Sequence, residues 1–135
     1  MTIFAINTST MKKANGPIKK TTANPKKAIR EMRAGVPGRV VGNKRETHKM
    51  SYIGDTSKKR GEFGVFPTIA PKLGKSKSTS PLDWVGQGPK QAEAKGEMIW
   101  VKSRRKAEKL AAGSWKKGIE RKEAMKEYRA SKKRN

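Results

Sequence analysis

Residues 61–74, with the sequence GEFGVFPTIAPKLG, contain the strongest indication of specific tertiary contact in the chain. Their large apolar side chains are Phe63, Val65, Phe66, Ile69 and Leu73. Proline has no amide hydrogen to donate to a sheet, so Pro67 and Pro71 are typical of an edge strand or of an extended segment that lies on another surface. We therefore expect this stretch to be extended and to dock on a neighbouring protein.

The residues that follow also favour a docking segment. Residues 75–81, KSKSTSP, have the composition of a linker. A second short apolar group follows and ends in the glycine-rich residues 86–89. We interpret residues 61–88 as a docking segment that inserts into a groove of its partner. Beyond the first stretch, the docking residues that we predict are Leu82, Trp84, Val85, Ile99 and Trp100.

Charge is distributed unevenly along the chain. The 135 residues include 34 Lys and Arg against 11 Asp and Glu, a formal net charge of +23. Residues 1–60 carry a net charge of +12, residues 61–100 of +1, and residues 101–135 of +10. A near-neutral middle therefore lies between two cationic arms. Because like charges repel, the arms resist compaction until an acidic partner neutralises part of their charge.

The first arm is expected to be mostly extended, because Gly-Pro, Asn-Pro and Pro-Gly pairs interrupt it repeatedly. One short helix is predicted near residues 25–34. Asn24 can cap this helix, Pro25 suits its first position, and Gly35 can supply the left-handed residue that ends it. A short strand is predicted over residues 39–41.

The second arm is helical by propensity. A helix is predicted over about residues 89–112, beginning at Pro89 and ending before Gly113. On a helical wheel its apolar residues form one modest stripe, separate from a basic face. This face consists of Lys102, Arg105, Lys106 and Lys109. A second helix, predicted over residues 117–131, has no apolar stripe and is expected to be solvated or to face a polyanion.

Together these features predict a small, mostly irregular and extended chain with few short β segments and with helices concentrated in the C-terminal third. The apolar fraction is 33%, below the roughly 45–50% of ordinary globular proteins. Low hydrophobicity with high net charge is typical of disorder in isolation, so we expect no large independent core. The predicted parts are a basic extended arm (1–60), the docking segment (61–88) and a basic helical arm (89–135).

The residue types offer little for catalysis or metal binding. The chain has no cysteine and a single histidine, His48, beside Lys49 in a polar, basic stretch. We expect His48 to lie at the surface or to contact a polyanion, because a general base needs a dry, shaped site. A zinc site needs several Cys or His ligands. Asp55 and Asp83 lie in turn-like surroundings and are expected to cap backbone groups. We predict a non-enzymatic protein without metal or cofactor.

The sequence predicts neither a membrane span nor secretion. No apolar run approaches the ~20 residues that a span requires. The apolar patch at residues 3–6 lacks the preceding charge and the length of a signal peptide. We expect an intracellular location, in the cytoplasm, the nucleoid or nucleus, or an organelle matrix, or a place within a virion.

Clusters of Lys and Arg recur along both arms. Such clusters on an extended chain can contact successive phosphates and release counterions at each contact. Lys outnumbers Arg, which favours charge neutralisation over bidentate recognition of bases. The polyanion-binding residues that we predict are Lys12, Lys13, Lys19, Lys20, Lys26, Lys27, Arg30, Arg33, Lys58, Lys59, Arg60, Lys102, Arg104, Arg105, Lys106, Lys109, Lys116, Lys117, Lys132, Lys133 and Arg134.

The larger aromatic side chains allow two interpretations. Trp84, Trp100, Trp115 and Tyr128 can stack on unpaired bases, or they can anchor the chain on a protein surface. For Trp84 and Trp100 we prefer the protein contact, because both belong to the predicted docking set.

Two functions fit this layout. The first is a structural subunit of a large assembly that binds RNA or DNA with little sequence preference and docks on a neighbouring protein through its middle. The alternative is a minor capsid or internal virion protein that cements larger subunits and makes few nucleic-acid contacts. In composition the chain resembles proteins that fill and cement large assemblies, such as ribosomal proteins and minor capsid proteins.

Overall fold

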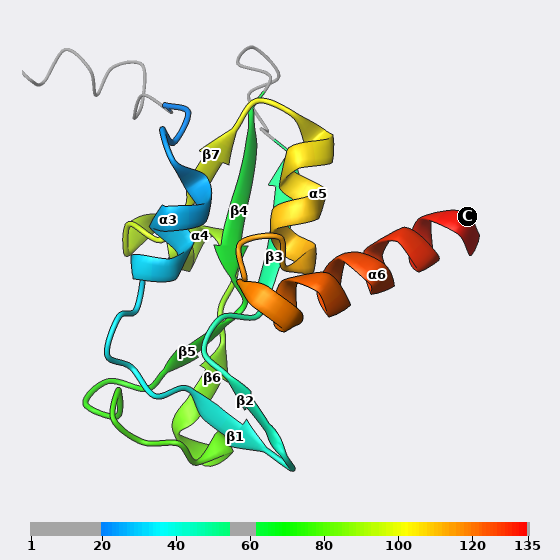
Figure 1. Ribbon diagram of the computed structural model, residues 1–135. Coiled ribbons are helices and arrows are strands. Elements are labelled where there is room, and N and C mark those ends of the chain that lie inside the picture. Colours follow the sequence, from blue (N-terminus) through cyan, green and yellow to red (C-terminus); the bar gives the residue numbers. More distant parts are fainter. Residues whose placement is uncertain (1–19, 55–61, 135) are drawn as a thin grey trace, which may run out of the picture.

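The computed structural model describes residues 20–54 and 62–134. At its centre is an antiparallel sheet of β3 (Met50–Gly54), β4 (Phe63–Pro67) and β7 (Ile99–Val101), in the order β3-β4-β7 (Figure 1). Tyr52 lies opposite Val65, and Val65 lies opposite Ile99. These three side chains share one face of the sheet, because residues directly opposite one another point to the same side.

Two helices cover this face. α3 (Pro25–Glu31) contacts β7, and α5 (Arg104–Ala112) contacts all three strands. The fully or nearly fully buried residues of the shared core are Ile29, Val65, Ile99, Val101, Ala107 and Leu110. α4 (Pro89–Ala94) contacts β4 outside this cluster and buries Ala92.

The lower part of the molecule in Figure 1 consists of two small antiparallel sheets. β1 (Arg39–Val41) pairs with β2 (Lys44–Glu46), and β5 (Ile69–Pro71) pairs with β6 (Trp84–Gly86). The short 3-10 helix η1 (Pro81–Asp83) leads into β6 and contacts β1. We call residues 37–46 and 69–86 the hairpin lobe.

Trp84 anchors the hairpin lobe. Its side chain is buried, and its indole N–H donates a hydrogen bond of 3.0 Å to the carbonyl oxygen of Ser78. The last helix, α6 (Gly118–Arg134), contacts α5 and then extends away from the rest of the molecule (Figure 1).

The expectation of a mostly irregular chain with no independent core is wrong. Within the described residues, seven strands and four helices form several antiparallel sheets and a shared core. The strands in the central sheet are only three to five residues long. β4 also pairs with β7, which is distant in sequence, and such pairing depends on tertiary context more than on local propensity.

The single helix predicted over residues 89–112 is also wrong. α4 ends at Ala94, and Gly96 then adopts a φ of +78° that an α-helix does not accommodate. The following β-branched and aromatic residues form β7, which pairs with β4. α5 begins anew at Arg104, capped by the Ser103 side chain, which accepts a hydrogen bond from the amide of Lys106.

Of the two alternatives for Phe63–Pro67, an edge strand or an extended segment lying on another surface, the edge strand is wrong because β4 is the central strand. Pro67 is its last residue, where a missing amide hydrogen interrupts little of the ladder. The Pro67 carbonyl oxygen accepts a hydrogen bond of 2.9 Å from the Gln87 side chain. Pro71 likewise ends β5.

Several local predictions are confirmed. The Asn24 side chain accepts a hydrogen bond from the amide of Lys27, Pro25 is the first residue of α3, and Gly35 has a φ of +86° beyond its end. β1 spans the residues predicted for it. α6 begins at Gly118, one residue after the start of the predicted second helix (117–131), and continues to Arg134.

Candidate nucleic-acid interface

A glycine determines how α6 leaves α5. Gly113 caps α5 with a φ of +120°, a conformation that residues with a side chain rarely adopt. A Cβ atom added to Gly113 would lie 2.8 Å from the Cβ atom of Ala124. Because residue 113 is a glycine, the buried Ala124 of α6 can pack directly against the end of α5.

Glu108 of α5 holds α6 in place through its carboxylate. The hydroxyl groups of Tyr52 and Tyr128 donate hydrogen bonds of 3.2 and 3.0 Å to it, and the Lys132 ammonium lies 2.9 Å away. Hydrogen bonds from Lys132 and Tyr128 hold the pKa of Glu108 below its usual value. Burial and the Glu108 carboxylate raise the pKa of Tyr128. This cluster links α5, β3 and α6.

Four cations form a continuous stripe on the side of α6 opposite Ala124. At about 100° per residue, their positions fall within a narrow arc centred roughly 170° from Ala124. All four side chains are exposed, and among the described residues none of the four forms an ion pair. The members of this α6 basic stripe are Lys122, Lys126, Arg129 and Lys133.

The acidic residues of α6 lie on a different side of the helix. Glu120, Glu123 and Glu127 fall on an arc roughly 120° from the centre of the basic stripe, at 3.6 residues per turn. They therefore leave the outer face cationic. At 1.5 Å per residue the stripe is about 16 Å long.

A second group of cations lies at and around the first turns of α5. Their side chains are exposed, apart from that of Lys109, which is partly buried. α5 lies on the side of the molecule from which α6 projects (Figure 1). These residues are Lys102, Arg104, Arg105, Lys106 and Lys109, and all five are among the predicted polyanion contacts.

Other predicted contacts are dispersed. Lys20 and Lys117 are exposed, Lys26 and Lys116 are partly buried, and Lys27 lies 3.9 Å from the Glu31 carboxylate. The Arg30 guanidinium donates a hydrogen bond of 2.8 Å to the Trp115 carbonyl oxygen, and Lys132 is engaged with Glu108. Predicted contacts that lie outside the described residues are Lys12, Lys13, Lys19, Lys58, Lys59 and Arg60, and the side chain of Arg134 is not described.

Arg33 was predicted to contact a polyanion, but its side chain is buried at the junction of the central sheet and the hairpin lobe. Its guanidinium makes two hydrogen bonds to the Glu97 carboxylate, of 3.0 and 2.9 Å. It also donates to the carbonyl oxygens of Thr47 and Ile69. Burial raises the pKa of Glu97, but hydrogen bonds from Arg33 and Gln87 outweigh it, so that the pKa is below its usual value.

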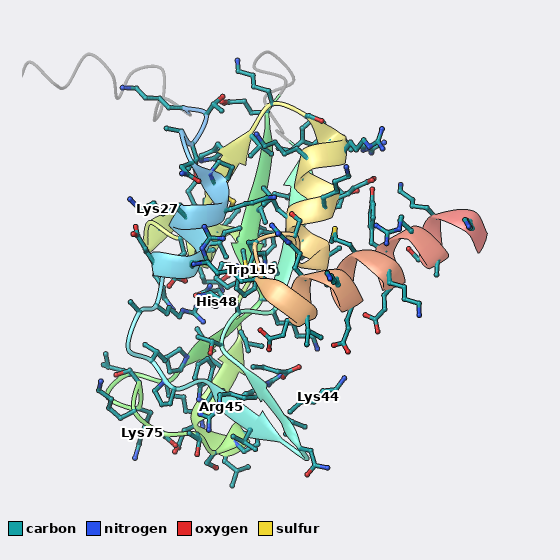
Figure 2. The ribbon with its side chains drawn as sticks, viewed as in Figure 1. Lys27, Lys44, Arg45, His48, Lys75 and Trp115 are labelled. Atoms are coloured by element: carbon teal, nitrogen blue, oxygen red, sulfur yellow. The ribbon has the colours of Figure 1, made fainter. Side chains whose placement is uncertain are left out.

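His48 lies next to this junction and is half-buried, not a surface residue as expected. Its ring meets the Trp115 ring edge-on, with centroids 5.3 Å apart (Figure 2). Burial and the Arg33 guanidinium lower the pKa of His48 from 6.5 to about 4, although Glu97 opposes the shift. The imidazole is therefore neutral near pH 7, and its buried Nε2 atom has no hydrogen-bond partner among the described residues.

The predicted docking residues separate into two groups. Val65, Phe66, Ile69, Trp84 and Ile99 are buried within the chain, and Phe63 and Trp100 are partly buried. The remaining three are exposed: Leu73, Leu82 and Val85.

The reading of the sequence missed three members of the α6 basic stripe. Lys122, Lys126 and Arg129 were not among the predicted contacts, although Lys133 was. Their spacing of four and three residues, continued to Lys133, is the signal that identifies them. Asp83, expected to cap the backbone, accepts a hydrogen bond of 2.5 Å from the Ser78 hydroxyl group.

No helix in residues 20–54 and 62–134 is long and apolar enough to cross a membrane. Within the same ranges no group of three or more His, Asp or Glu side chains is arranged to hold a metal ion. Comparisons with protein-family models, with curated proteins and with solved structures found no match.

Proposed function

We propose that this protein is a non-enzymatic structural protein that binds the phosphate backbone of nucleic acid through α6 and α5. The observation that carries the proposal is the α6 basic stripe, four exposed cations on one helix face without an acidic partner among the described residues. A row of unpaired cations repels itself, and phosphate groups relieve that repulsion while counterions are released.

The surroundings of the aromatic residues favour phosphate contacts over base stacking. Trp84 is buried, Trp115 packs against His48, and Tyr128 is bonded to Glu108. All three side chains contact other residues of the chain, whereas proteins that bind single strands present aromatic rings to the bases. We therefore expect duplex DNA or RNA to bind at least as well as single strands, with little sequence preference.

The shape of α6 suits a phosphate backbone. The helix projects from the side of the molecule (Figure 1), and its basic stripe lies on the side opposite the buried Ala124. Duplex DNA carries one phosphate charge per ~1.7 Å of its axis, so a stripe about 16 Å long can contact several phosphates at once. Three of its four cations are lysines, which act as point charges and tolerate varied phosphate geometry.

Fluorescence anisotropy with labelled duplex and single-stranded oligonucleotides tests this proposal. The test variant replaces Lys122, Lys126, Arg129 and Lys133 by Gln. The matched control replaces Glu120, Glu123 and Glu127 by Gln on the same helix. We expect the test variant to weaken duplex binding and to reduce the slope of log K against log salt by about 0.9 for each lost phosphate contact.

The control should bind as well as the unmodified protein or more tightly, because it raises the net charge of α6. Equal binding by the unmodified protein and the test variant would contradict the proposal. A strong preference for single strands, with binding insensitive to salt, would also contradict it.

The alternative function, a cementing virion protein with few nucleic-acid contacts, draws on a different observation. Leu73 and Leu82 are exposed on the hairpin lobe, away from α6. If this alternative holds, the test variant and the unmodified protein will bind oligonucleotides equally weakly at physiological salt.

A further inference from the structure

Exposed aliphatic side chains are concentrated on the hairpin lobe. Among the described residues, five large hydrophobic side chains are exposed, and four of them belong to this lobe. Leu73 and Leu82 are the most exposed, at 103% and 81%. The other two are Val41 and Val85, and the fifth, Ile119, lies on α6. Isolated exposed apolar residues are ordinary, but a group on adjoining elements indicates an interaction site.

The elements that carry these side chains are fastened to one another. The amide of Lys72 donates a hydrogen bond of 2.8 Å to the Asp83 carbonyl oxygen, which joins the segment after β5 to η1. The amide of Val40 donates one of 2.8 Å to the Thr79 carbonyl oxygen, which joins β1 to the segment before η1. These hydrogen bonds therefore fix the positions of the backbone segments that carry the four aliphatic side chains.

Their exposure follows from the anchoring of the lobe. Successive side chains of a strand point to opposite sides, so the buried Trp84 directs its neighbour Val85 outward. The Ser80 hydroxyl group accepts a hydrogen bond from the Leu82 amide and fixes the start of η1. These exposed positions are thus a product of the fold.

The lobe also carries unneutralised positive charge. Four of its lysines are exposed and form no ion pair with any described residue: Lys44, Lys72, Lys75 and Lys77. Its two acidic residues are both engaged. Glu46 pairs with Arg39 at 2.9 Å, and Asp83 accepts the Ser78 hydroxyl hydrogen. Lys44 and Lys75 lie on opposite sides of the lower part of the molecule in Figure 2.

We propose that the hairpin lobe is a second binding site, which docks a protein segment that carries acidic side chains beside aliphatic ones. Charge complementarity selects acidic groups for the four lysines. The aliphatic side chains select a protein over a nucleic acid, because Leu and Val offer no ring for base stacking and gain from apolar burial. This site goes beyond the proposed function, since it uses none of the cations of α5 or α6.

Selection from a displayed library of short random peptides tests the proposal. We expect the unmodified protein to enrich peptides that combine Asp or Glu with Leu, Ile, Val or Phe. A synthetic copy of an enriched peptide should bind about tenfold more weakly when Leu73, Leu82 and Val85 are replaced by Ser, because the apolar contact is lost. Replacing Lys72, Lys75 and Lys77 by Gln should weaken binding and reduce its dependence on salt.

Two controls separate this site from the proposed nucleic-acid site. The variant with four Gln substitutions on α6 should retain peptide binding, and the variant with three Ser substitutions should retain duplex binding and its thermal unfolding temperature. The proposal is overturned if no peptide is enriched, if purely acidic peptides bind equally to the Ser variant, or if the α6 substitutions abolish peptide binding. Concentration-dependent dimerisation that the Ser substitutions remove would assign the surface to a second copy of this chain and would likewise overturn it.

Discussion

The α6 basic stripe and the hairpin lobe both expose lysines, but the side chains around those lysines differ. On α6 the four cations follow one another along a helix face, with Ile119 as the exposed large hydrophobic residue near its beginning. The hairpin lobe exposes four large aliphatic side chains as well as its lysines: Val41, Leu73, Leu82 and Val85. Net charge alone therefore does not distinguish the two surfaces, because the side chains between the cations differ in polarity.

The two regions are also attached differently. α6 meets the rest of the molecule at its first half and through the Glu108 cluster. The hairpin lobe is joined through a buried ion pair, Arg33–Glu97, whose guanidinium also reaches the Ile69 carbonyl oxygen of β5. Substitutions at each attachment can therefore disturb one region and spare the other.

Arg33→Ala should have the largest effect. It leaves the mostly buried Glu97 carboxylate without its ion-pair partner and with only the Gln87 hydrogen bond, and the loss of one member of a buried pair costs up to about 3–5 kcal/mol. We expect a correspondingly lower free energy of unfolding by urea titration and loss of peptide binding at the hairpin lobe. The double variant Arg33→Met/Glu97→Leu removes both charges and should recover much of the stability. Equal stability of Arg33→Ala and the unmodified protein would show that the pair does not hold the junction.

Gly113→Ala should disturb the attachment of α6. The substitution forces a side chain into a φ of +120° and against the Cβ atom of Ala124. Strain of this kind costs about 1–3 kcal/mol, so we expect a lower unfolding temperature and weaker duplex binding with unchanged peptide binding. Gly118→Ala is the matched control, because Gly118 has a φ of +60° but open space around it. A larger loss in the control than in Gly113→Ala would refute the close packing.

Acid should weaken the junction of the hairpin lobe before the attachment of α6. The pKa of His48 is lowered from 6.5 to about 4, so the unfolded chain binds more protons than the folded one between these values. Stability conferred by the neutral imidazole is complete above pH 6.5 and is lost as the pH falls toward 4. Thermal unfolding measured across this range should show the decline.

His48→Phe keeps a ring beside Trp115 but cannot titrate, so its unfolding temperature should change less between pH 6.5 and pH 4. The lowered pKa of Glu97 adds a further loss at lower pH in both proteins, as that carboxylate becomes protonated. Parallel pH profiles of the two proteins would exclude His48 as the source of the decline.

Tyr128→Phe should have the smallest effect. It removes one hydrogen bond to Glu108 and leaves the ion pair with Lys132 in place. The cost is about 1 kcal/mol, seen as a slightly lower unfolding temperature and a small decrease in duplex affinity. An effect as large as that of Gly113→Ala would mean that this hydrogen bond, more than the packing of Ala124, orients α6.

Local signals in the sequence predicted the elements whose determinants are adjacent in the chain. Asn24 and Pro25 predict the start of α3, and the helix-forming residues after Gly118 predict α6. β7 was missed because Ile99 and Val101 acquire their partner only when β4 lies beside them. Because the residues on both sides of Gly96 favour a helix, the sequence did not reveal that the helix is interrupted there.

The same contrast applies to the candidate interface. The cations of α5 were predicted because they are adjacent in the sequence, where such a cluster can be recognised without a structure. The burial of Arg33 was not predictable, because its partner Glu97 is 64 residues away. The spacing of the cations on α6 is readable from the sequence, but that they face away from α5 follows only from the side on which Ala124 packs.

The hydrogen bond between Arg30 and the Trp115 carbonyl oxygen has a consequence for synthesis on the ribosome. It joins residues 85 positions apart, and Ile29 on the same helix packs in the core with Leu110. α3 is too short to be stable alone, and its partners in β7 and at Trp115 are made well after it. We therefore expect this part of the core to form only after those later residues have been made, because contacts between distant residues form slowly.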